Sequence, residues 1–355
     1  MNKALSYSNK IFKLLGFLFI FPILLLFIFL IRAMAPIYLV RLKELYSHRF
    51  GHFCIEPEIY LARQSLAVNK RRGIDLFCLD ALPVSNRHLA RMWSREMHFL
   101  SVIRPLIRVN RMFPGWQKHE VPWDDIFGQS DELKKTEPFL KFTEAESIYG
   151  ERKLRDILGS RNGPIVCVFN RDSTYLSQHA PYRSWDYHDY RDSDIETYIP
   201  AMEWLAEQGY VVFRMGAIVN KPLPDNLHPN IIDYATLHRS EFLDIYIPFK
   251  CSFLLVATSG PSALGNVFRR PQAYINAAPF LTTTIPKANP NELVIPKLYF
   301  SDRTQKHLSI EEIIELGAEK FDKGEQFQAL GIRLVDNDEA DILTVAQEIE
   351  GLVSG

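Results

Sequence analysis

Apolar residues occur in three patterns along this chain of 355 residues. The first is an unbroken apolar stretch near the amino terminus, from Leu14 to Ile31. The second, over residues 36–160, mixes short apolar runs with segments of helical spacing. The third, over residues 161–308, repeats a short apolar run followed by an amphipathic segment. These patterns predict a membrane segment followed by two α/β domains.

The amino-terminal stretch has 18 residues and no charge. As a helix it would reach about 27 Å, enough to cross a hydrocarbon core. Ala33-Met34-Ala35 also fits a signal-peptide cleavage site, but the length of the stretch and the neighbouring Arg32 and Pro36 favour a retained anchor over residues 1–35. Basic residues nearly balance across the stretch, and their slight bias predicts a single-pass protein of the inner (cytoplasmic) membrane with its body in the cytoplasm.

Residues 36–160 are predicted to form a first Rossmann-like domain. We expect a strand at 74–79, helices at 59–68, 86–97 and 144–158, a strand-to-loop corner at 51–55 and strand potential over 98–109. His52 lies at the expected corner, with Glu56 and Glu58 nearby. Imidazole titrates near neutral pH, so His52 is a candidate general base, although a lone histidine is more often structural.

Residues 161–308 are predicted to form a second Rossmann-like domain. Strands are expected at 165–169, 210–213, 231–233, 253–257 and 273–275, with helices between them. Ser193-x-x-Glu196 predicts a capping box at the start of the first of these helices. This alternation is typical of a doubly wound parallel sheet, which binds its ligands at the carboxyl ends of its strands. Residues 309–355 are predicted to form two helices, at 309–321 and 339–352, that pack back across both domains.

Polar residues follow four of these predicted strands, and Arg191 lies in an aromatic loop between the first two strands. Arginine suits a diphosphate because its planar guanidinium donates two parallel hydrogen bonds, and an adjacent carboxylate can hold a sugar hydroxyl or orient the arginine. A local ion pair, a turn or a helix cap remains the structural alternative at each position. The predicted catalytic residue here is Asp172, and the predicted donor-binding residues are Arg171, Tyr175, Arg191, Arg214, Gly216, Ser259, Gly260 and Asn276.

No metal site is predicted. Asp192-Ser193-Asp194 has the order of a metal–diphosphate motif, but helix capping is sufficient to explain it, and Asp336-Asn337-Asp338 is weaker still. The glycines match neither the dinucleotide-binding fingerprint nor a P-loop. Cys54, Cys78, Cys167 and Cys251 form no CxxC pair and are expected to be buried thiols. We therefore expect no cofactor.

The charges exclude one class of partner. Lys and Arg (41) balance Asp and Glu (42), and a net charge of −1 argues against a dedicated nucleic-acid binder. Residues 36–120 carry 14 basic and 7 acidic side chains, a local net charge of +7. A basic region beside a membrane segment suits an anionic surface or a phosphate-bearing substrate.

Several segments match a known family in their order and spacing. They are FGHF and EPEIYL at 50–61, VFNRDSTYL at 168–176, DYRDSDIETYIPAMEWLAEQGYVVFRMG at 189–216, IIDYA at 231–235, SEFLDIYI at 240–247, TSG at 258–260 and RRPQAYIN at 269–276. In combination they resemble a bacterial family of GT-B-like glycosyltransferases associated with surface-polysaccharide and O-antigen gene clusters. Family members often have His–Val before Arg–Asp, where this chain has Phe169 and Asn170.

The resemblance implies two Rossmann-like domains facing a cleft, with a nucleotide-sugar donor in the second domain, an acceptor against the first and no essential metal. It implies a glycosyltransferase that moves a sugar to a surface-polysaccharide, lipopolysaccharide or lipid-linked glycan acceptor. Two alternatives stay open: transfer of another group, such as a phospho or pyruvyl group, onto a glycan, and a non-catalytic membrane-anchored assembly protein.

Overall fold

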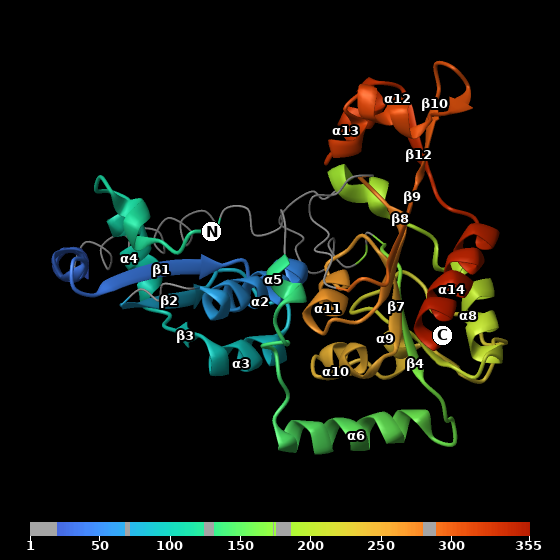
Figure 1. The fold of residues 1–355 in the computed structure, drawn as a ribbon, viewed down its shortest axis with the longest axis horizontal. Coiled ribbons are helices and arrows are strands. Elements are labelled where there is room, and N and C mark those ends of the chain that lie inside the picture. Colours follow the sequence, from blue (N-terminus) through green and yellow to red (C-terminus); the bar gives the residue numbers. More distant parts are fainter. Residues whose placement is uncertain (1–19, 68–71, 124–130, 173, 175–185, 280–288) are drawn as a thin grey trace, which may run out of the picture. The chain divides into compact units, whose positions relative to one another are not determined.

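The computed structural model describes residues 20–67, 72–123, 131–172, 174, 186–279 and 289–355 (Figure 1). Their contacts divide the chain into two compact units. The first unit holds the chain up to residue 48 together with residues 66–85 and 93–124. The second holds residues 49–65, 86–92 and 125–355. This division differs from the predicted domain boundary at residue 160, because residues 49–65 and 125–160 make their contacts within the second unit.

Within the described residues, the first unit is a parallel sheet in the order β1-β2-β3, packed with two helices. Its elements are a helix at residues 20–34, β1 (Leu39–Leu45), β2 (Gly73–Leu79), β3 (His98–Phe99), α4 (Ile103–Asn110) and the 3-10 helix η1 (Trp116–His119). The strand predicted over 98–109 is wrong beyond Phe99. Ile103, Leu106 and Ile107 fall on one buried face of α4, a spacing that suits a helix.

The helix at residues 20–34 has two unlike faces. Leu24 and Ile28 are buried in the core of the first unit, whereas Ile23, Phe27 and Leu30 are exposed. The membrane span predicted from Leu14 to Ile31 begins outside the described residues. In the described part of the chain, no helix is both long enough and apolar enough to cross a membrane.

The second unit contains a parallel sheet in the order β6-β5-β4-β7-β8-β9. Its strands are β4 (Ile165–Phe169), β5 (Val211–Arg214), β6 (Ile231–Ile232), β7 (Phe253–Ala257), β8 (Gln272–Ala277) and β9 (Glu292–Pro296). In chain order this arrangement is 3-2-1-4-5-6, the order of a doubly wound nucleotide-binding sheet. The prediction of a doubly wound parallel sheet is therefore confirmed for this unit.

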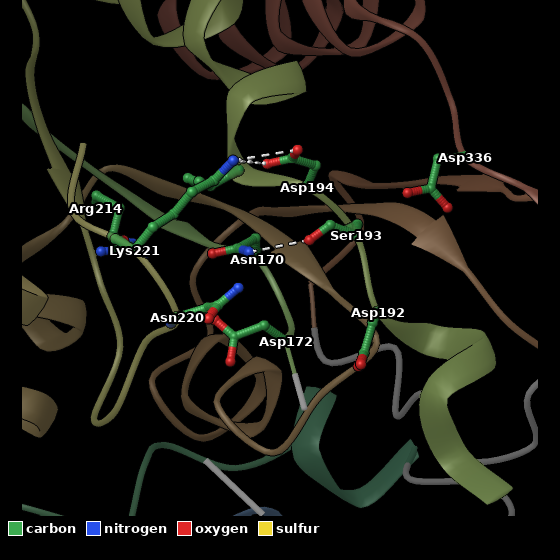
Figure 2. A pocket seen from close by; sticks show the side chains of 10 residues that line it. Asn170, Asp172, Asp192, Ser193, Asp194, Arg214, Asn220, Lys221 and Asp336 are labelled. Carbon is green, nitrogen blue, oxygen red and sulfur yellow. Dashed lines mark hydrogen bonds and ion pairs between the residues drawn. The ribbon is translucent and has the colours of Figure 1, made fainter. Parts of the chain in front are cut away.

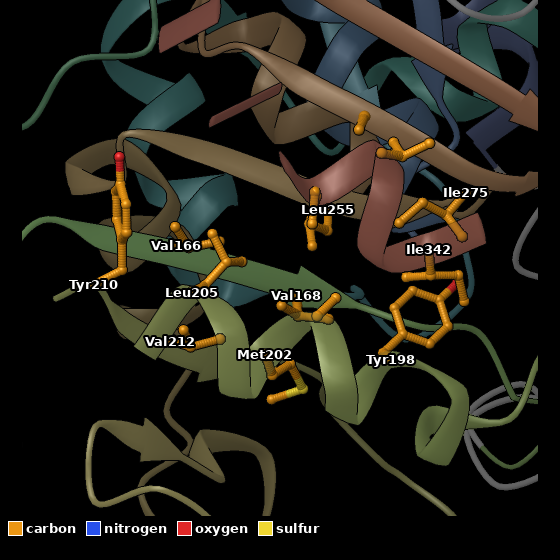
Figure 3. Packing of buried hydrophobic residues seen from close by; sticks show 14 of the residues in the cluster. Val166, Val168, Tyr198, Met202, Leu205, Tyr210, Val212, Leu255, Ile275 and Ile342 are labelled. Atoms are coloured by element: carbon orange, nitrogen blue, oxygen red, sulfur yellow. The ribbon is translucent and has the colours of Figure 1, made fainter. Parts of the chain in front are cut away.

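Helices cover both faces of this sheet, with α8 and α14 on one side and α10 and α11 on the other (Figure 1). The helices are α2 (Phe50–Leu66), α5 (Asp131–Lys134), α6 (Glu144–Leu158), η2 (Asp186–Arg191), η3 (Ile195–Tyr198), α8 (Ile199–Glu207), α9 (Tyr234–Leu237), α10 (Leu243–Lys250), α11 (Ser262–Val267) and α14 (Glu339–Ser354). The residues of α3 (Arg87–Glu96) are divided, with 86–92 assigned to the second unit and 93–96 to the first. Figure 3 shows Val168 and Leu255 of the strands packing with Met202 of α8 and Ile342 of α14. All four cysteines are buried and free, as predicted.

Two predictions about where a helix begins are wrong. Residues 51–55 are not a corner, because they lie inside α2, which begins at Phe50 and buries Phe53, Cys54 and Ile55. Ser193 does not cap the helix that follows it. Asp194 does so instead, accepting the backbone N–H of Glu196 at 3.0 Å, and η3 leads directly into α8.

A small antiparallel sheet, in the order β11-β10-β12, lies between β9 and α14 and was not predicted. Its elements are β10 (Leu298–Ser301), β11 (Lys306–His307), α12 (Ile310–Glu315), η4 (Ala318–Lys320), α13 (Gly324–Ala329) and β12 (Ile332–Val335). Tyr299, Ile313 and Phe327 form its own core. The two helices predicted after residue 308 therefore exist in part, as α12 and α14, and α14 packs against α8 and the large sheet.

Candidate functional site

A polar pocket of about 380 Å³ opens at the carboxyl ends of β4 and β5 (Figure 2). Asn170 and Asp172 follow β4, and Arg214 is the last residue of β5. The other lining residues come from the segments before α8, after β5 and before α14, and they are Asp192, Ser193, Asp194, Ile195, Asn220, Lys221 and Asp336. The pocket thus lies at the edge of the sheet where a doubly wound fold binds its ligands.

Each carboxylate of the pocket has defined partners. Asp172 accepts the backbone N–H groups of Thr174 at 3.0 Å and Asn220 at 3.1 Å. Asp194 lies 3.0 Å from the ammonium group of Lys221. Backbone and ammonium donors lower the pKa of Asp194, the N–H of Glu196 most strongly. These carboxylates are therefore held in fixed positions rather than left as mobile surface charges.

Three cations gather around Asp192, which lines the pocket. Arg171 Nε lies 3.0 Å from Asp192 Oδ1, and Lys297 Nζ donates to the backbone oxygen of Asp192 at 2.5 Å. Burial lowers the pKa of Arg171, and the neighbouring charge of Arg191 lowers it further, although Asp192 opposes both effects. Lys297 is 4% exposed and also lies 2.7 Å from Asp336 Oδ1. The structure thus brings Arg171 and Arg191, both predicted to bind the donor, to one place.

Arg214 lines the same pocket, but its guanidinium serves the fold. Its side chain is fully buried, and Nη1 bonds Asp233 Oδ1 at 2.9 Å while Nη2 donates to the backbone oxygen of Lys221 at 3.0 Å. Its Nε is buried with no hydrogen-bond partner among the described residues. Gly216 follows closely, and a Cβ there would meet Val219 Cγ1 at 2.7 Å. At the end of β5, Arg214 and Gly216 are therefore held by contacts within the fold.

The turn after β7 holds Ser259 and Gly260 and lies against the start of α2. A Cβ on Gly51 would approach the Gly260 Cα to 2.9 Å, so the two backbones touch. The buried hydroxyl oxygens of Thr258 and Ser259 have no hydrogen-bond partner among the described residues. The helix that follows, α11, has only six residues, so its dipole is small.

His52 lies in the first turn of α2, close in sequence to this contact. Its Nδ1 is 2.6 Å from Glu56 Oε1, one helical turn later, and its Nε2 is 3.5 Å from Arg49 Nη1. Both ring nitrogens of His52 therefore face charged groups of its own helix terminus, and its role as general base stays a prediction.

The remaining predicted donor-binding residues are Asn276 and Tyr175. Asn276 is fully buried inside β8 and exchanges two hydrogen bonds with Asn337, at 2.9 and 2.6 Å, which tie the sheet to the segment before α14. Its amide is therefore committed to the fold. Tyr175 and most of the aromatic loop that precedes Asp186 lie outside the described residues.

The sequence did not single out Lys221 or Lys297. Lys297 follows Pro296 between two strands, and a lysine among apolar strand residues was the signal that could have found it. No cluster of metal-ligating side chains occurs among the residues that the structure describes. The absence of a metal requirement remains a prediction.

No protein-family model matches the sequence, and no curated protein matches it. Solved structures do resemble it. The ADP-heptose lipopolysaccharide heptosyltransferase II of E. coli is 13% identical, with 82% of this chain and 98% of that chain covered and a TM-score of 0.43. A family 9 glycosyl transferase from Veillonella parvula is 10% identical, with 88% and 96% covered and a TM-score of 0.47. An E. coli heptosyltransferase with ADP-2-deoxy-2-fluoro heptose is 10% identical, with 80% and 100% covered and a TM-score of 0.37.

Proposed function

We propose that this protein is a GT-B-like glycosyltransferase that moves a sugar from a nucleotide-sugar donor to a surface-polysaccharide or lipid-linked glycan acceptor, without a metal ion. The observation that carries the proposal is the polar pocket at the carboxyl edge of the doubly wound sheet, with Arg171, Arg191 and Lys297 gathered beside it. The resemblance of the sequence segments to glycosyltransferases supports the same conclusion.

The chemistry of the pocket suits a sugar. Sugar hydroxyls need both acceptors and donors of hydrogen bonds, and the pocket offers carboxylates, amides and an ammonium group within about 380 Å³. That volume lies in the range of small-molecule pockets, roughly 300–1,000 Å³. Asp172, whose two oxygens accept backbone N–H groups, is fixed well enough to select the orientation of one sugar hydroxyl.

The cations beside the pocket suit a diphosphate. Asp192 holds the guanidinium of Arg171 at Nε, and among the described residues the side chain of Arg171 has no other hydrogen-bond partner, so we assign its two terminal nitrogens to phosphate oxygens. As the bond from the sugar to the diphosphate breaks, negative charge develops on the leaving group. Cations that are already in place stabilise that charge without rearrangement. We therefore assign the diphosphate to Arg171 and Arg191, and not to Arg214.

We also propose that the protein acts at the inner membrane, with its body in the cytoplasm. On the helix at residues 20–34, Ile23, Phe27 and Leu30 are 50%, 52% and 50% exposed, an apolar face that suits a lipid surface. Flotation of the full chain with anionic vesicles tests this idea. Binding should fall when Phe27 and Leu30 become serine, and should persist when the exposed Ile148 of the second unit becomes serine.

Thermal unfolding of the full chain with nucleoside diphosphates, with and without EDTA, tests the donor site. A ligand at 100 times its Kd should stabilise the protein by about 2.7 kcal/mol, and the shift should survive EDTA. Arg171→Ala should abolish the shift and lower transfer roughly 100- to 1,000-fold, on the scale of losing one charge-stabilising donor. The control is Arg333→Ala, which removes an exposed arginine paired with Asp302.

The outcomes separate the proposal from its alternatives. A shift that Arg171→Ala leaves unchanged would contradict the assignment of the diphosphate site. No shift with any nucleotide would contradict the donor proposal and favour another group transfer or an assembly role.

A further inference from the structure

The small antiparallel sheet and its helices begin and end at the candidate site. We call residues 298–335 the small-sheet segment; it contains β10, α12, α13 and β12 (Figure 1). Its first residue, Leu298, lies opposite its last residue, Val335, in the pairing of β10 with β12. The flanking residues are therefore neighbours, and Lys297 Nζ lies 2.7 Å from Asp336 Oδ1. Asp336 lines the polar pocket, so the base of the small-sheet segment is part of the pocket wall.

Lys297 also joins this base to the segment that precedes α8. Its Nζ donates to the backbone oxygen of Asp192 at 2.5 Å, and only 4% of Lys297 is exposed. An ammonium group that is shielded from water makes strong hydrogen bonds to carboxylate and carbonyl oxygens. Asp192 is therefore held from its backbone side, while its carboxylate holds Arg171 Nε at 3.0 Å.

A second contact joins the small-sheet segment to Tyr190, two positions before Asp192. The ring of Tyr190 packs on Phe327 of α13, with the ring centroids 5.3 Å apart. Phe327 is 3% exposed and packs in turn on Tyr299 and Phe321, in the core of the small-sheet segment. The short 3-10 helix η2, to which Tyr190 belongs, is thus anchored on a packed apolar surface.

Arg191 lies between these two contacts, and Tyr190 orients its guanidinium. Arg191 Nε donates to the Tyr190 hydroxyl at 2.9 Å, and among the described residues the side chain of Arg191 has no other hydrogen-bond partner. Burial raises the pKa of Tyr190, although the charge of Arg191 opposes the rise, so the hydroxyl is neutral near neutral pH and can accept this bond. A guanidinium held at Nε presents its two terminal nitrogens end-on, the geometry in which arginine donates two parallel bonds to a phosphate.

The two arginines that we assign to the diphosphate are therefore held in the same manner. Arg171 is held at Nε by Asp192, and Arg191 is held at Nε by Tyr190. A mobile arginine side chain loses rotamer entropy when it binds a ligand, and a side chain that is already ordered loses less. The residues that hold the arginines, Asp192 and Tyr190, are the two that the small-sheet segment and its base contact.

We propose that the small-sheet segment positions the two diphosphate ligands of the donor site, an inference that rests on the proposed function. Tyr190 orients Arg191. Lys297 fixes Asp192, and Asp192 in turn orients Arg171. Tyr190 and Lys297 are positioning residues, because each acts through an arginine rather than on the donor. The affinity for a nucleoside diphosphate therefore depends on a part of the chain that lies outside the large sheet.

The test measures the Kd of full-length proteins for ADP, CDP, GDP, UDP and dTDP by titration calorimetry. Tyr190→Phe keeps the ring on Phe327 and removes the oxygen that accepts from Arg191. This variant should bind the nucleotide that the wild type prefers about 10-fold more weakly, on the scale of one hydrogen bond to a charged group. In an Arg191→Ala background, the same substitution should change the Kd less than about 2-fold, because the arginine that it orients is absent.

A pair of substitutions tests Lys297. Lys297→Met removes the ammonium group and should weaken nucleotide binding about 10-fold, whereas Lys297→Arg keeps a cation at this position and should recover most of the loss. Lys320→Met is the matched control, because this lysine of the small-sheet segment is 77% exposed and should leave the Kd unchanged.

The outcomes separate this inference from the proposed function. Wild-type affinity in Tyr190→Phe would overturn the inference, as would an equal loss with and without Arg191, since that would indicate a general structural effect. Wild-type affinity in Lys297→Met, or no recovery in Lys297→Arg, would overturn the role of Lys297. If the wild type binds none of the five nucleotides, the proposed donor site fails and this inference fails with it. Normal binding by the wild type together with unaffected variants overturns the inference alone.

Discussion

Replacing Arg269 with methionine should destabilise the protein by about 3–5 kcal/mol, because it leaves a buried carboxylate without its counter-charge. The carboxylate belongs to Glu58, which is fully buried in α2. It lies 2.9 Å from Arg269 Nη2 and accepts the backbone N–H groups of Phe139 and Leu140 at 3.0 and 3.2 Å. Burial raises the pKa of Glu58, and the charge of Arg269 is the largest influence that lowers it.

Replacing Glu58, the other partner of this ion pair, should destabilise the protein less. Glutamine at position 58 keeps one oxygen for a backbone N–H, and Arg269 keeps its bonds to the backbone oxygens of Leu133, Asn266 and Val267. We expect Glu58→Gln to lower the free energy of unfolding by about 1–3 kcal/mol, on the scale of one imperfectly satisfied buried group. The double variant should lose less than the sum of the two, with a coupling of about 2 kcal/mol.

The loss in Arg269→Met should also depend on pH. Without the guanidinium, the pKa of Glu58 in the folded state rises further above its value in the unfolded chain. A carboxyl with a raised pKa contributes stability at low pH that is lost as the pH rises through the folded-state pKa. The deficit of Arg269→Met relative to the wild type should therefore be smaller in acid than at neutral pH.

Urea unfolding of the wild type, both single variants and the double variant, at an acidic and a neutral pH, measures all of these quantities. Arg333→Met is the matched control, since its arginine is 60% exposed and should contribute less than about 1 kcal/mol. Single effects that add without coupling, together with a deficit that does not change with pH, would refute the reasoning.

Three further predictions concern stability. Burial raises the pKa of Asp244 to about 6, so its contribution to stability is present below its unfolded pKa and is lost as the pH rises toward 6. Asp244→Asn should flatten this decline of the free energy of unfolding with pH. Urea unfolding measures it, and an unchanged dependence on pH would contradict the prediction. Gly150→Ala in α6 would bring a Cβ to 2.4 Å from a tyrosine ring of α10 and should destabilise the protein by about 1–3 kcal/mol. A Cβ on Gly351 in α14 would meet nothing within 4 Å, so Gly351→Ala should stabilise the protein by about 0.5–1 kcal/mol. Equal effects of the two variants on thermal unfolding would contradict both predictions. Gly51→Ala would push a Cβ to 2.9 Å from the Gly260 backbone and should lower the melting temperature, and a wild-type melting temperature would show that the two backbones can separate freely.

The sequence predicted those elements whose own residues identify the secondary structure without help from distant contacts. The strands at 165–169 and 253–257 and the helix at 144–158 were predicted with the bounds that the structure has. Wholly apolar short runs have few alternatives to a buried strand, and in the structure the helix is capped by Thr143. β1 was not predicted, because its sequence LVRLKEL places Lys43 beside Glu44 and so breaks the alternation of apolar and polar residues that indicates a strand. Arg41 in that strand is paired with Asp75 of β2 at 2.6 Å, a partner that the sequence cannot reveal.

The start of α2 shows a conflict between local preference and packing. Gly51 and Pro57 both disfavour a helix interior, and a corner was predicted at 51–55. The helix forms because it buries Phe53, Cys54 and Ile55, and because Gly51 allows the close approach to Gly260. Tertiary packing therefore outweighs helix propensity here, and only the structure could show it.

For the site residues, too, the sequence predicted positions but not long-range partners. A strand end predicts where a side chain emerges, and Arg171, just after β4, does lie beside Asp192 of the pocket. It does not predict which side chains are already committed. Arg214 is bound to a carboxylate 19 positions further along the chain, and Asn276 to an asparagine 61 positions further, so these two residues face the fold.

The acidic motif that resembles a metal-binding sequence has a different role in our proposal. A carboxylate that binds a divalent metal must be free to reach it, whereas Asp192 lies 3.0 Å from Arg171 and Asp194 lies 3.0 Å from Lys221. Each acid already holds a positive charge in a fixed position. A diphosphate that arrived at this pocket would meet these cations in place of a metal ion, and the carboxylates would orient the cations without binding the ligand. Persistence of nucleotide binding in EDTA is therefore the outcome that our proposal predicts.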